Sequence, residues 1–167
     1  AMKCEIESSN EDEIIVEVTS DRPDLFSSEG IARAIRNYLG IDTDYVIRRS
    51  SNSPLTITVS ESVSLVRPFI VSAAIRGVSL RWDALKQMMQ LQEKLHNTYG
   101  AKRKKASIGI YDLDKVSPPF TYTALPPDDI TFIPLEHSSP MSGREILKNT
   151  SKGKEYGGII SESPLYP

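Results

Sequence analysis

A strand-like run followed at once by a proline corner is the feature that most constrains how the start of this chain can fold. Residues 13–19 have the β-branched content of a strand. Pro23 fixes its own φ and favours extended backbone at Arg22, so the strand ends there. The side-chain oxygen of Asp24 or Ser27 can then accept from the free N–H groups of a starting helix. The pattern favours a capped turn in which Arg22 bridges the two aspartates of the corner.

The helix predicted after the corner is short and amphipathic. Ile31, Ile35 and Leu39 recur at helical spacing. Gly40 follows where a left-handed residue commonly ends a helix. One face of this helix is therefore expected to be partly buried.

Composition indicates an ordinary soluble chain. Its 167 residues are 39% hydrophobic and 25% charged, without a long apolar run, which fits one domain or one domain with an appendage. The single cysteine, Cys4, excludes an internal disulfide framework and fits a reducing compartment. No signal or transit peptide and no membrane span are recognisable, so we expect a cytoplasmic protein.

The formal net charge of −2 shows that the chain as a whole is not a polycation that binds nucleic acid. Any contact with nucleic acid must therefore be local. The best candidate is a run of four cations that could neutralise phosphates: Lys102, Arg103, Lys104 and Lys105. A solvated charged surface is the alternative interpretation of this run.

The middle of the chain reads as a linker, two strands and a long helix. Residues 42–54 have linker composition, which places a domain boundary there. Residues 55–59 alternate with period 2, and residues 69–75 are continuously apolar, as in a central strand buried on both faces. Residues 83–99 predict the longest helix, closed by Gly100.

Several side chains near this helix could suggest a cofactor or catalytic site. For Trp82, Met88 and Met89, packing in the core is the favoured interpretation. His96 and His137 have no cysteine or aspartate partner at motif spacing, so we interpret each as structural or solvated.

Two carboxylates follow the strand predicted at residues 106–111. Asp112 and Asp114 could share a cation, act as a general base, or accept backbone hydrogen bonds in a turn. The turn is favoured, because a metal site would need a third acidic ligand and none is close in sequence.

The remaining segments are short. Residues 120–124 and 130–135 are expected to be loops or edge strands, and Ser142 with Glu145 forms a capping-box pattern that opens a short helix through Leu147. No phosphate-binding loop, dinucleotide fingerprint, zinc-protease motif, paired cysteines or nucleophile elbow is present. The predicted fold is α+β: a mixed or antiparallel sheet packed by one long and two or more short helices, with a small N-terminal α/β piece.

Five motifs, in this order and spacing, resemble one protein family. They are TSDRPDLFSSEGIARAIRNYLG, RPFIVSAA, LQEKLH, KKASIGIYDLDKVSPPFTYTA and the terminal PLYP. Together they resemble the N-terminal half of the phenylalanyl-tRNA synthetase β subunit of the archaeal and eukaryotic type. The resemblance is weakest at residues 42–60 and 136–160.

The resemblance implies a role in translation. The family's β subunit joins a catalytic α subunit in a heterotetramer of two α and two β subunits, which ligates phenylalanine to tRNA(Phe) with ATP and magnesium. Its B3/B4 region hydrolyses tyrosine wrongly attached to that tRNA. Residues 1–54 then correspond to the end of a small N-terminal module and a linker, and residues 55–167 to the first part of the B3/B4 editing domain.

The implied site assignments are modest. No catalytic residue is named, and no metal or cofactor is expected in this part, since ATP and magnesium belong to the whole enzyme. The cationic run is expected to approach the tRNA acceptor end. Ser107, Tyr111, Asp112 and Asp114 are expected to border the editing cavity. Membrane and DNA are not expected partners.

Two other function classes compete with editing. One is a non-enzymatic module that binds tRNA or braces the α subunit without editing activity of its own. The weaker one is a metal-dependent hydrolase that uses Asp112 and Asp114.

Overall fold

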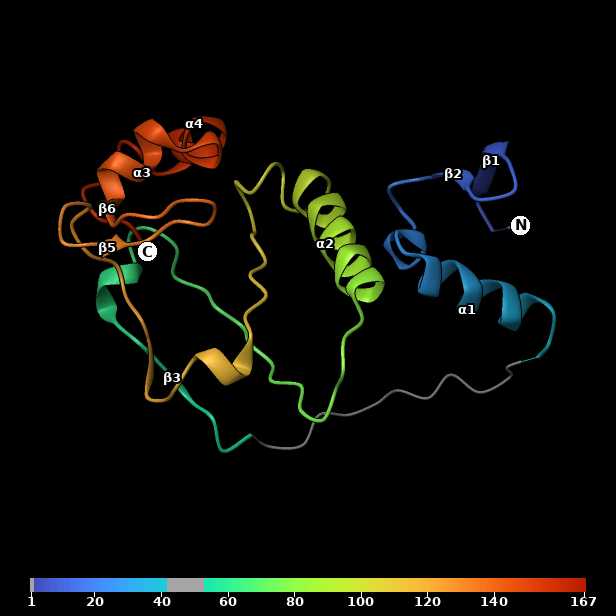
Figure 1. Ribbon diagram of the computed structural model, residues 1–167, viewed down its shortest axis with the longest axis horizontal. Coiled ribbons are helices and arrows are strands. Elements are labelled where there is room, and N and C mark those ends of the chain that lie inside the picture. Colours follow the sequence, from blue (N-terminus) through green and yellow to red (C-terminus); the bar gives the residue numbers. More distant parts are fainter. Residues whose placement is uncertain (1, 42–52) are drawn as a thin grey trace. The chain divides into compact units, whose positions relative to one another are not determined.

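The computed structural model describes residues 2–41 and 53–167, and its secondary structure is a mixture of short strands and helices (Figure 1). It forms two compact units: Ala1–Ser50 with Gly77–Ile108, and Ser51–Arg76 with Gly109–Pro167. The predicted α+β class is confirmed. Most of the predicted linker, residues 42–52, lies outside the described residues, and the domain boundaries stay a prediction.

The first unit opens with a β-hairpin. Strand β1 (Cys4–Ser9) pairs antiparallel with β2 (Ile14–Val18), with a register shift between Ile6 and Ser8. Asn10 closes the turn, because its side-chain oxygen accepts from the backbone N–H groups two and three residues later, at 2.9 and 2.8 Å. Strand β2 confirms the strand predicted before the proline corner.

The corner and the helix after it also follow the prediction. A 3-10 turn, η1 (Pro23–Leu25), leads into α1 (Ser28–Tyr38). Ser27 is the N-cap, since its hydroxyl accepts from the Gly30 N–H at 3.1 Å. Gly40 has a φ of 69°, the left-handed conformation expected after the helix.

The long helix α2 (Trp82–Asn97) belongs to the same unit. Lys94 Nζ donates to the Phe26 carbonyl at 2.8 Å, and Tyr99 donates its hydroxyl proton to the Ser20 carbonyl at 2.7 Å. The predicted core packing is wrong for Trp82 and Met89, which are 73% and 52% exposed, whereas Met88 is half-buried. The described part of the unit covers only one side of the helix.

The second unit contains a two-stranded parallel sheet. Strand β3 (Ile57–Val59) pairs with β4 (Phe120–Tyr122) and is followed by the 3-10 turn η2 (Glu61–Val63). Ser62 joins the two segments, because its hydroxyl oxygen accepts from the Ala124 N–H at 2.9 Å. Ala124 is buried and forms part of the small core of this unit.

The end of the chain forms a short hairpin and two short helices. Strands β5 (Thr131–Phe132) and β6 (Met141–Ser142) are antiparallel, and α3 (Gly143–Asn149), α4 (Ser151–Tyr156) and the turn η4 (Gly157–Ile159) follow. The predicted capping box is confirmed: the Ser142 N–H donates to Glu145 Oε2 at 2.8 Å, and the Glu145 N–H donates to Ser142 Oγ at 3.3 Å.

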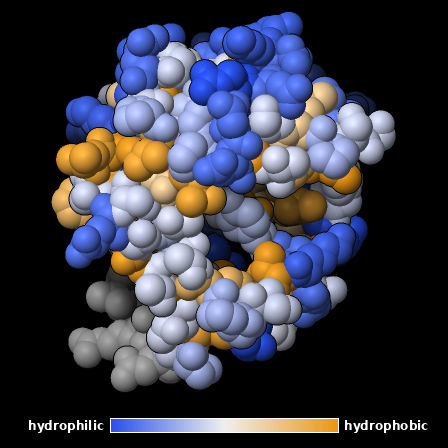
Figure 2. Space-filling model, turned by 90° about the vertical axis from the view of Figure 1, so that its left-hand side faces the viewer, coloured by the Kyte–Doolittle hydropathy of each residue, from blue (hydrophilic) through white to orange (hydrophobic). Residues whose placement is uncertain are grey.

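Two predicted strands are wrong. Residues 69–75 and 106–111 are not strands, and Phe69 and Val71 are 92% and 98% exposed rather than buried. A strand is stabilised by a hydrogen-bonded neighbour, and no described segment pairs with either run. Apolar side chains therefore reach the surface, and Figure 2 shows orange patches between hydrophilic ones on one face.

Candidate functional site

The four predicted cations lie on a turn with unusual backbone geometry. Ala101, Lys102 and Arg103 have φ values of 48°, 55° and 67°, three successive residues in the left-handed region. Left-handed backbone costs a non-glycine residue roughly 1–2 kcal/mol. Gly100, which was predicted to close the helix, has no left-handed backbone itself, and the left-handed residues are the next three. Gly100 is needed for another reason, because a Cβ there would lie 2.6 Å from the Ala106 carbonyl oxygen.

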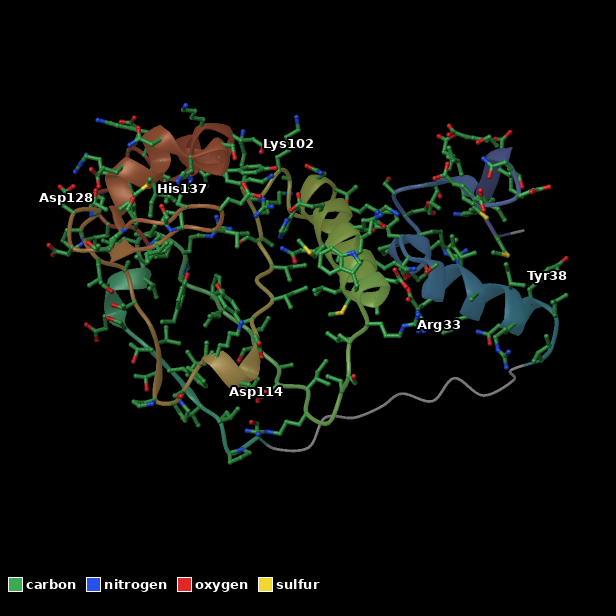
Figure 3. The ribbon with its side chains drawn as sticks, viewed as in Figure 1. Arg33, Tyr38, Lys102, Asp114, Asp128 and His137 are labelled. Carbon is green, nitrogen blue, oxygen red and sulfur yellow. The ribbon has the colours of Figure 1, made fainter. Side chains whose placement is uncertain are left out.

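We define the basic turn as Lys102–Lys105. Its arginine side chain and its lysine side chains point in different directions. Arg103 folds back and pairs with Glu93, and its side chain is only 22% exposed. The three lysines are exposed and form no ion pair with the described residues. Lys102 points away from the ribbon (Figure 3). The turn therefore presents three cations to solvent rather than four.

His96 lies beneath the basic turn and is structural, as predicted. Its side chain is 1% exposed, and Nε2 accepts from the Ile108 N–H at 2.7 Å. Nδ1 lies 3.4 Å from Glu93 Oε1. His137, the other histidine, is exposed in the loop between β5 and β6.

Asp112 and Asp114 lie in a turn, as the favoured interpretation of the sequence predicted. Asp112 is the N-cap of a 3-10 turn, η3 (Leu113–Lys115), and its Oδ1 accepts from the Asp114 N–H at 3.1 Å. Lys115 Nζ lies 4.0 Å from the other Asp112 oxygen. Among the described residues, no group of three metal-ligating side chains is present.

Ser107 and Tyr111 are exposed and lie in a segment without regular secondary structure. Ser107 belongs to the first unit, whereas Tyr111, Asp112 and Asp114 belong to the second. Their assignment to the border of an editing cavity stays a prediction.

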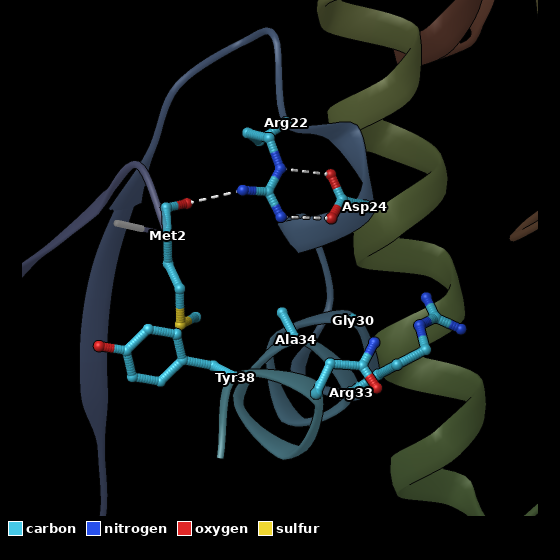
Figure 4. Close-up of a pocket in the computed structure, with 8 residues that line it drawn as sticks. Met2, Arg22, Asp24, Gly30, Arg33, Ala34 and Tyr38 are labelled. Carbon is cyan, nitrogen blue, oxygen red and sulfur yellow. Dashed lines mark hydrogen bonds and ion pairs between the residues drawn. The ribbon is translucent and has the colours of Figure 1, made fainter. Parts of the chain in front are cut away.

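A pocket of about 480 Å³ lies between the proline corner and α1 (Figure 4). None of the predicted site residues lines it. Its lining residues include Arg33, Asn37 and Tyr38 from one face of α1. No chemical motif in the sequence points to this pocket. Its one local signal is the small residue Gly30, which lets α1 approach the corner.

Ion pairs fix the wall of this pocket. The Arg22 guanidinium donates twice to the Asp24 carboxylate, at 2.9 and 2.7 Å, and once to the Met2 carbonyl at 2.9 Å. Arg22 does not bridge both aspartates, because Asp21 pairs with Lys3 at 2.6 Å. The hydrogen bond from Lys3 lowers the pKa of Asp21 to about 2. The hydrogen bonds from Arg22 lower the pKa of Asp24.

None of the helices in the described ranges is both long enough and apolar enough to cross a membrane.

Comparison with known proteins gives a consistent picture. No family model matches the chain. The chain is 43% identical over 170 residues to the phenylalanine-tRNA ligase β subunit of Thermococcus sibiricus, covering 99% of the chain and 30% of that protein. It is 40% identical over 163 residues to the β subunit of Methanospirillum hungatei, covering 98% of the chain and 30% of that protein.

A solved structure agrees with these relatives. It is an N-terminal fragment of the phenylalanyl-tRNA synthetase β subunit from Pyrococcus horikoshii, 37% identical, with a TM-score of 0.93 over 99% of this chain and 49% of that one. The chain spans about 30% of the length of the relatives named above. Over nearly all of its own length, it is similar to part of the β subunit of archaeal phenylalanine-tRNA ligases.

Proposed function

We propose that this chain is part of the β subunit of a phenylalanine-tRNA ligase and supports the hydrolytic editing of Tyr-tRNA(Phe) during translation. The observation that carries the proposal is similarity over 98–99% of the chain to such subunits, at about 40% identity. The match to a solved fragment of the same subunit supports it independently of single motifs.

A physical reason exists for editing in such an enzyme. Tyrosine differs from phenylalanine by one hydroxyl group, and an apolar synthetic pocket rejects an added hydroxyl only weakly. A second site that hydrogen-bonds this hydroxyl can restore accuracy. Hydrolysis of an aminoacyl ester needs a positioned water and donors for the developing oxyanion, so a nucleophilic triad is not required.

In this proposal the basic turn contacts the phosphates near the acceptor end of the tRNA. Lys102, Lys104 and Lys105 are exposed and unpaired among the described residues, so their charge is available to phosphates, whereas the charge of Arg103 is offset by Glu93. Each neutralised phosphate contributes about 0.7–0.9 to the slope of log affinity against log salt. Replacing the three lysines by alanine should weaken tRNA binding and flatten this slope.

Ser107, Tyr111, Asp112 and Asp114 are proposed to border the editing cavity. Hydroxyl groups can donate to a substrate oxygen, and a carboxylate can orient or deprotonate water. The test is Asp112→Asn with Asp114→Asn in the complete subunit. Loss of Tyr-tRNA(Phe) hydrolysis at unchanged melting temperature would support this role. Normal hydrolysis with a lowered melting temperature would leave the aspartates as turn residues only.

The partners and cofactors belong to the whole enzyme. We propose that the chain works beside a catalytic α subunit, in a heterotetramer located in the cytoplasm, with tRNA(Phe) as its nucleic-acid ligand. ATP and magnesium would act in the aminoacylation reaction rather than at these residues.

The second candidate function is to brace the α subunit without editing. The exposed apolar run at residues 69–75 favours it, because such a surface is suited to packing against other protein. Co-purification with the α subunit tests this role. If Phe69→Ser with Val71→Ser abolished co-purification, and the unchanged subunit hydrolysed no Tyr-tRNA(Phe), bracing without editing would be supported.

A further inference from the structure

We propose that His96 is a positioning residue that holds the basic turn in the shape needed to present its three lysines to RNA phosphates. This inference rests on the proposed function, because it assumes that the basic turn binds tRNA. It concerns a residue to which neither the sequence motifs nor the comparison with relatives assigns a role.

His96 holds the turn at two points, one within it and one beyond it. Its backbone carbonyl accepts from the Arg103 N–H at 3.3 Å, and its Nε2 accepts from the Ile108 N–H at 2.7 Å. A further backbone bond, from the Lys105 N–H to the Gly100 carbonyl at 2.9 Å, closes the loop between these points. The end of α2 therefore fixes the chain both inside and after the basic turn.

The hydrogen bond from Ile108 also determines the form of the imidazole. Because Nε2 is the acceptor, the neutral ring carries its proton on Nδ1. Nδ1 is buried, lies 3.4 Å from a Glu93 oxygen that also pairs with Arg103, and makes no hydrogen bond to the described residues. The negative charge of Glu93 close to Nδ1 is compatible with a proton on that nitrogen.

The backbone of the turn needs such support. Three successive non-glycine residues have positive φ, and they are kept in this conformation only if the surrounding contacts determine it. An apolar residue at position 96 could fill the same space, but it would leave the Ile108 N–H without its acceptor. The chemistry of the histidine, rather than its volume, is what the turn requires.

The experiment compares two substitutions that differ in where they place an acceptor. In His96→Gln the amide oxygen can reach the place of Nε2, whereas in His96→Asn it is one bond too short. Binding of tRNA(Phe) to the 167-residue chain and to the complete ligase is measured against salt. We expect His96→Asn to lower the slope of log affinity against log salt by about 1–2, the loss of one or two phosphate contacts. His96→Gln should restore most of it.

The controls separate this inference from the proposed function. His137→Asn changes the exposed histidine and should leave binding unchanged. If the variant with all three lysines replaced binds tRNA like the wild type, the proposed phosphate contact itself is wrong. If that variant binds weakly but a folded His96→Asn variant keeps the wild-type affinity and slope, the positioning role is overturned.

A second measurement keeps the inference testable if His96→Asn fails to fold. Nitrogen NMR of the wild-type chain reports which imidazole nitrogen carries the proton. The Nδ1–H tautomer, with slow exchange of the Ile108 amide proton, is the expected result. An Nε2–H tautomer would exclude the hydrogen bond on which the inference depends.

Discussion

A methyl group at Gly30 would lie 1.7 Å from the carbonyl oxygen of Asp24, far inside any tolerable contact. The nearest atoms belong to the backbone of the proline corner, so they cannot rotate away as a flexible side chain could. The absence of a side chain at this one residue therefore determines how closely α1 packs on the corner.

Gly30→Ala should lower the free energy of unfolding by about 1–3 kcal/mol, the usual range for overpacking. Gly158→Ala is the matched control, because a Cβ there meets no atom within 4 Å, and its effect should stay within about 0.5 kcal/mol. Chemical denaturation of the two variants checks this. Equal stabilities would show that the corner adjusts more easily than its geometry implies.

Asp21 links stability to pH. Its pKa is lowered from 3.8 to about 2 by the hydrogen bond from Lys3, so folding favours the charged form. This stabilisation is complete above about pH 3.8 and is lost as the pH falls towards 2. In Asp21→Asn, the decrease in unfolding free energy across this interval should be smaller than in the wild type. Asp12→Asn, which removes an exposed carboxylate without a described basic partner, should retain the wild-type decrease.

At the scale of the secondary-structure elements, the helices were predictable because their signals are local. Ser27 begins α1, and the Ser142 and Glu145 pair begins α3, at spacings that can be read directly from the sequence. The predicted strands at residues 69–75 and 106–111 failed because a strand depends on a neighbour elsewhere in the chain, which apolar content alone cannot supply.

The candidate site was predictable to the same limited extent. The cationic run can be read from the sequence. The pairing of Arg103 with Glu93 joins residues 10 positions apart, and the hydrogen bond between Ile108 and His96 joins residues 12 positions apart. No sequence motif indicates either interaction. Ala101, Lys102 and Arg103 have left-handed backbone, which residues of these types seldom adopt by themselves. Tertiary contacts decide this turn.

The capping box of α3 gives a prediction at this scale. Ser142→Ala removes the acceptor for the Glu145 N–H and should lower the free energy of unfolding by about 0.5–2 kcal/mol. Ser161→Ala is the control, since the hydroxyl of Ser161 makes no hydrogen bond within the described residues. Thermal denaturation compares the two. A control that destabilised as much as Ser142→Ala would contradict the capping role.

For the molecule as a whole, the proposed editing function depends on how much of the editing chemistry these residues contain. The chain matches 30% of its relatives' length, and the described residues contain no group of three or more side chains that could hold a metal ion. The proposed editing role therefore assigns to this chain an RNA-contacting turn and a border of the cavity, while other parts of the subunit complete the reaction site.

The most direct test is hydrolysis of Tyr-tRNA(Phe), with Phe-tRNA(Phe) as the control substrate, by four proteins. These are the 167-residue chain, the complete β subunit, and the complete subunit carrying either the three lysine-to-alanine changes or His137→Asn. We expect selective hydrolysis by the complete subunit, an unchanged rate for His137→Asn, and a rate reduced at limiting enzyme when the three lysines are removed. Equal hydrolysis of Tyr-tRNA(Phe) by the lysine variant and the wild type at every salt concentration would contradict this expectation.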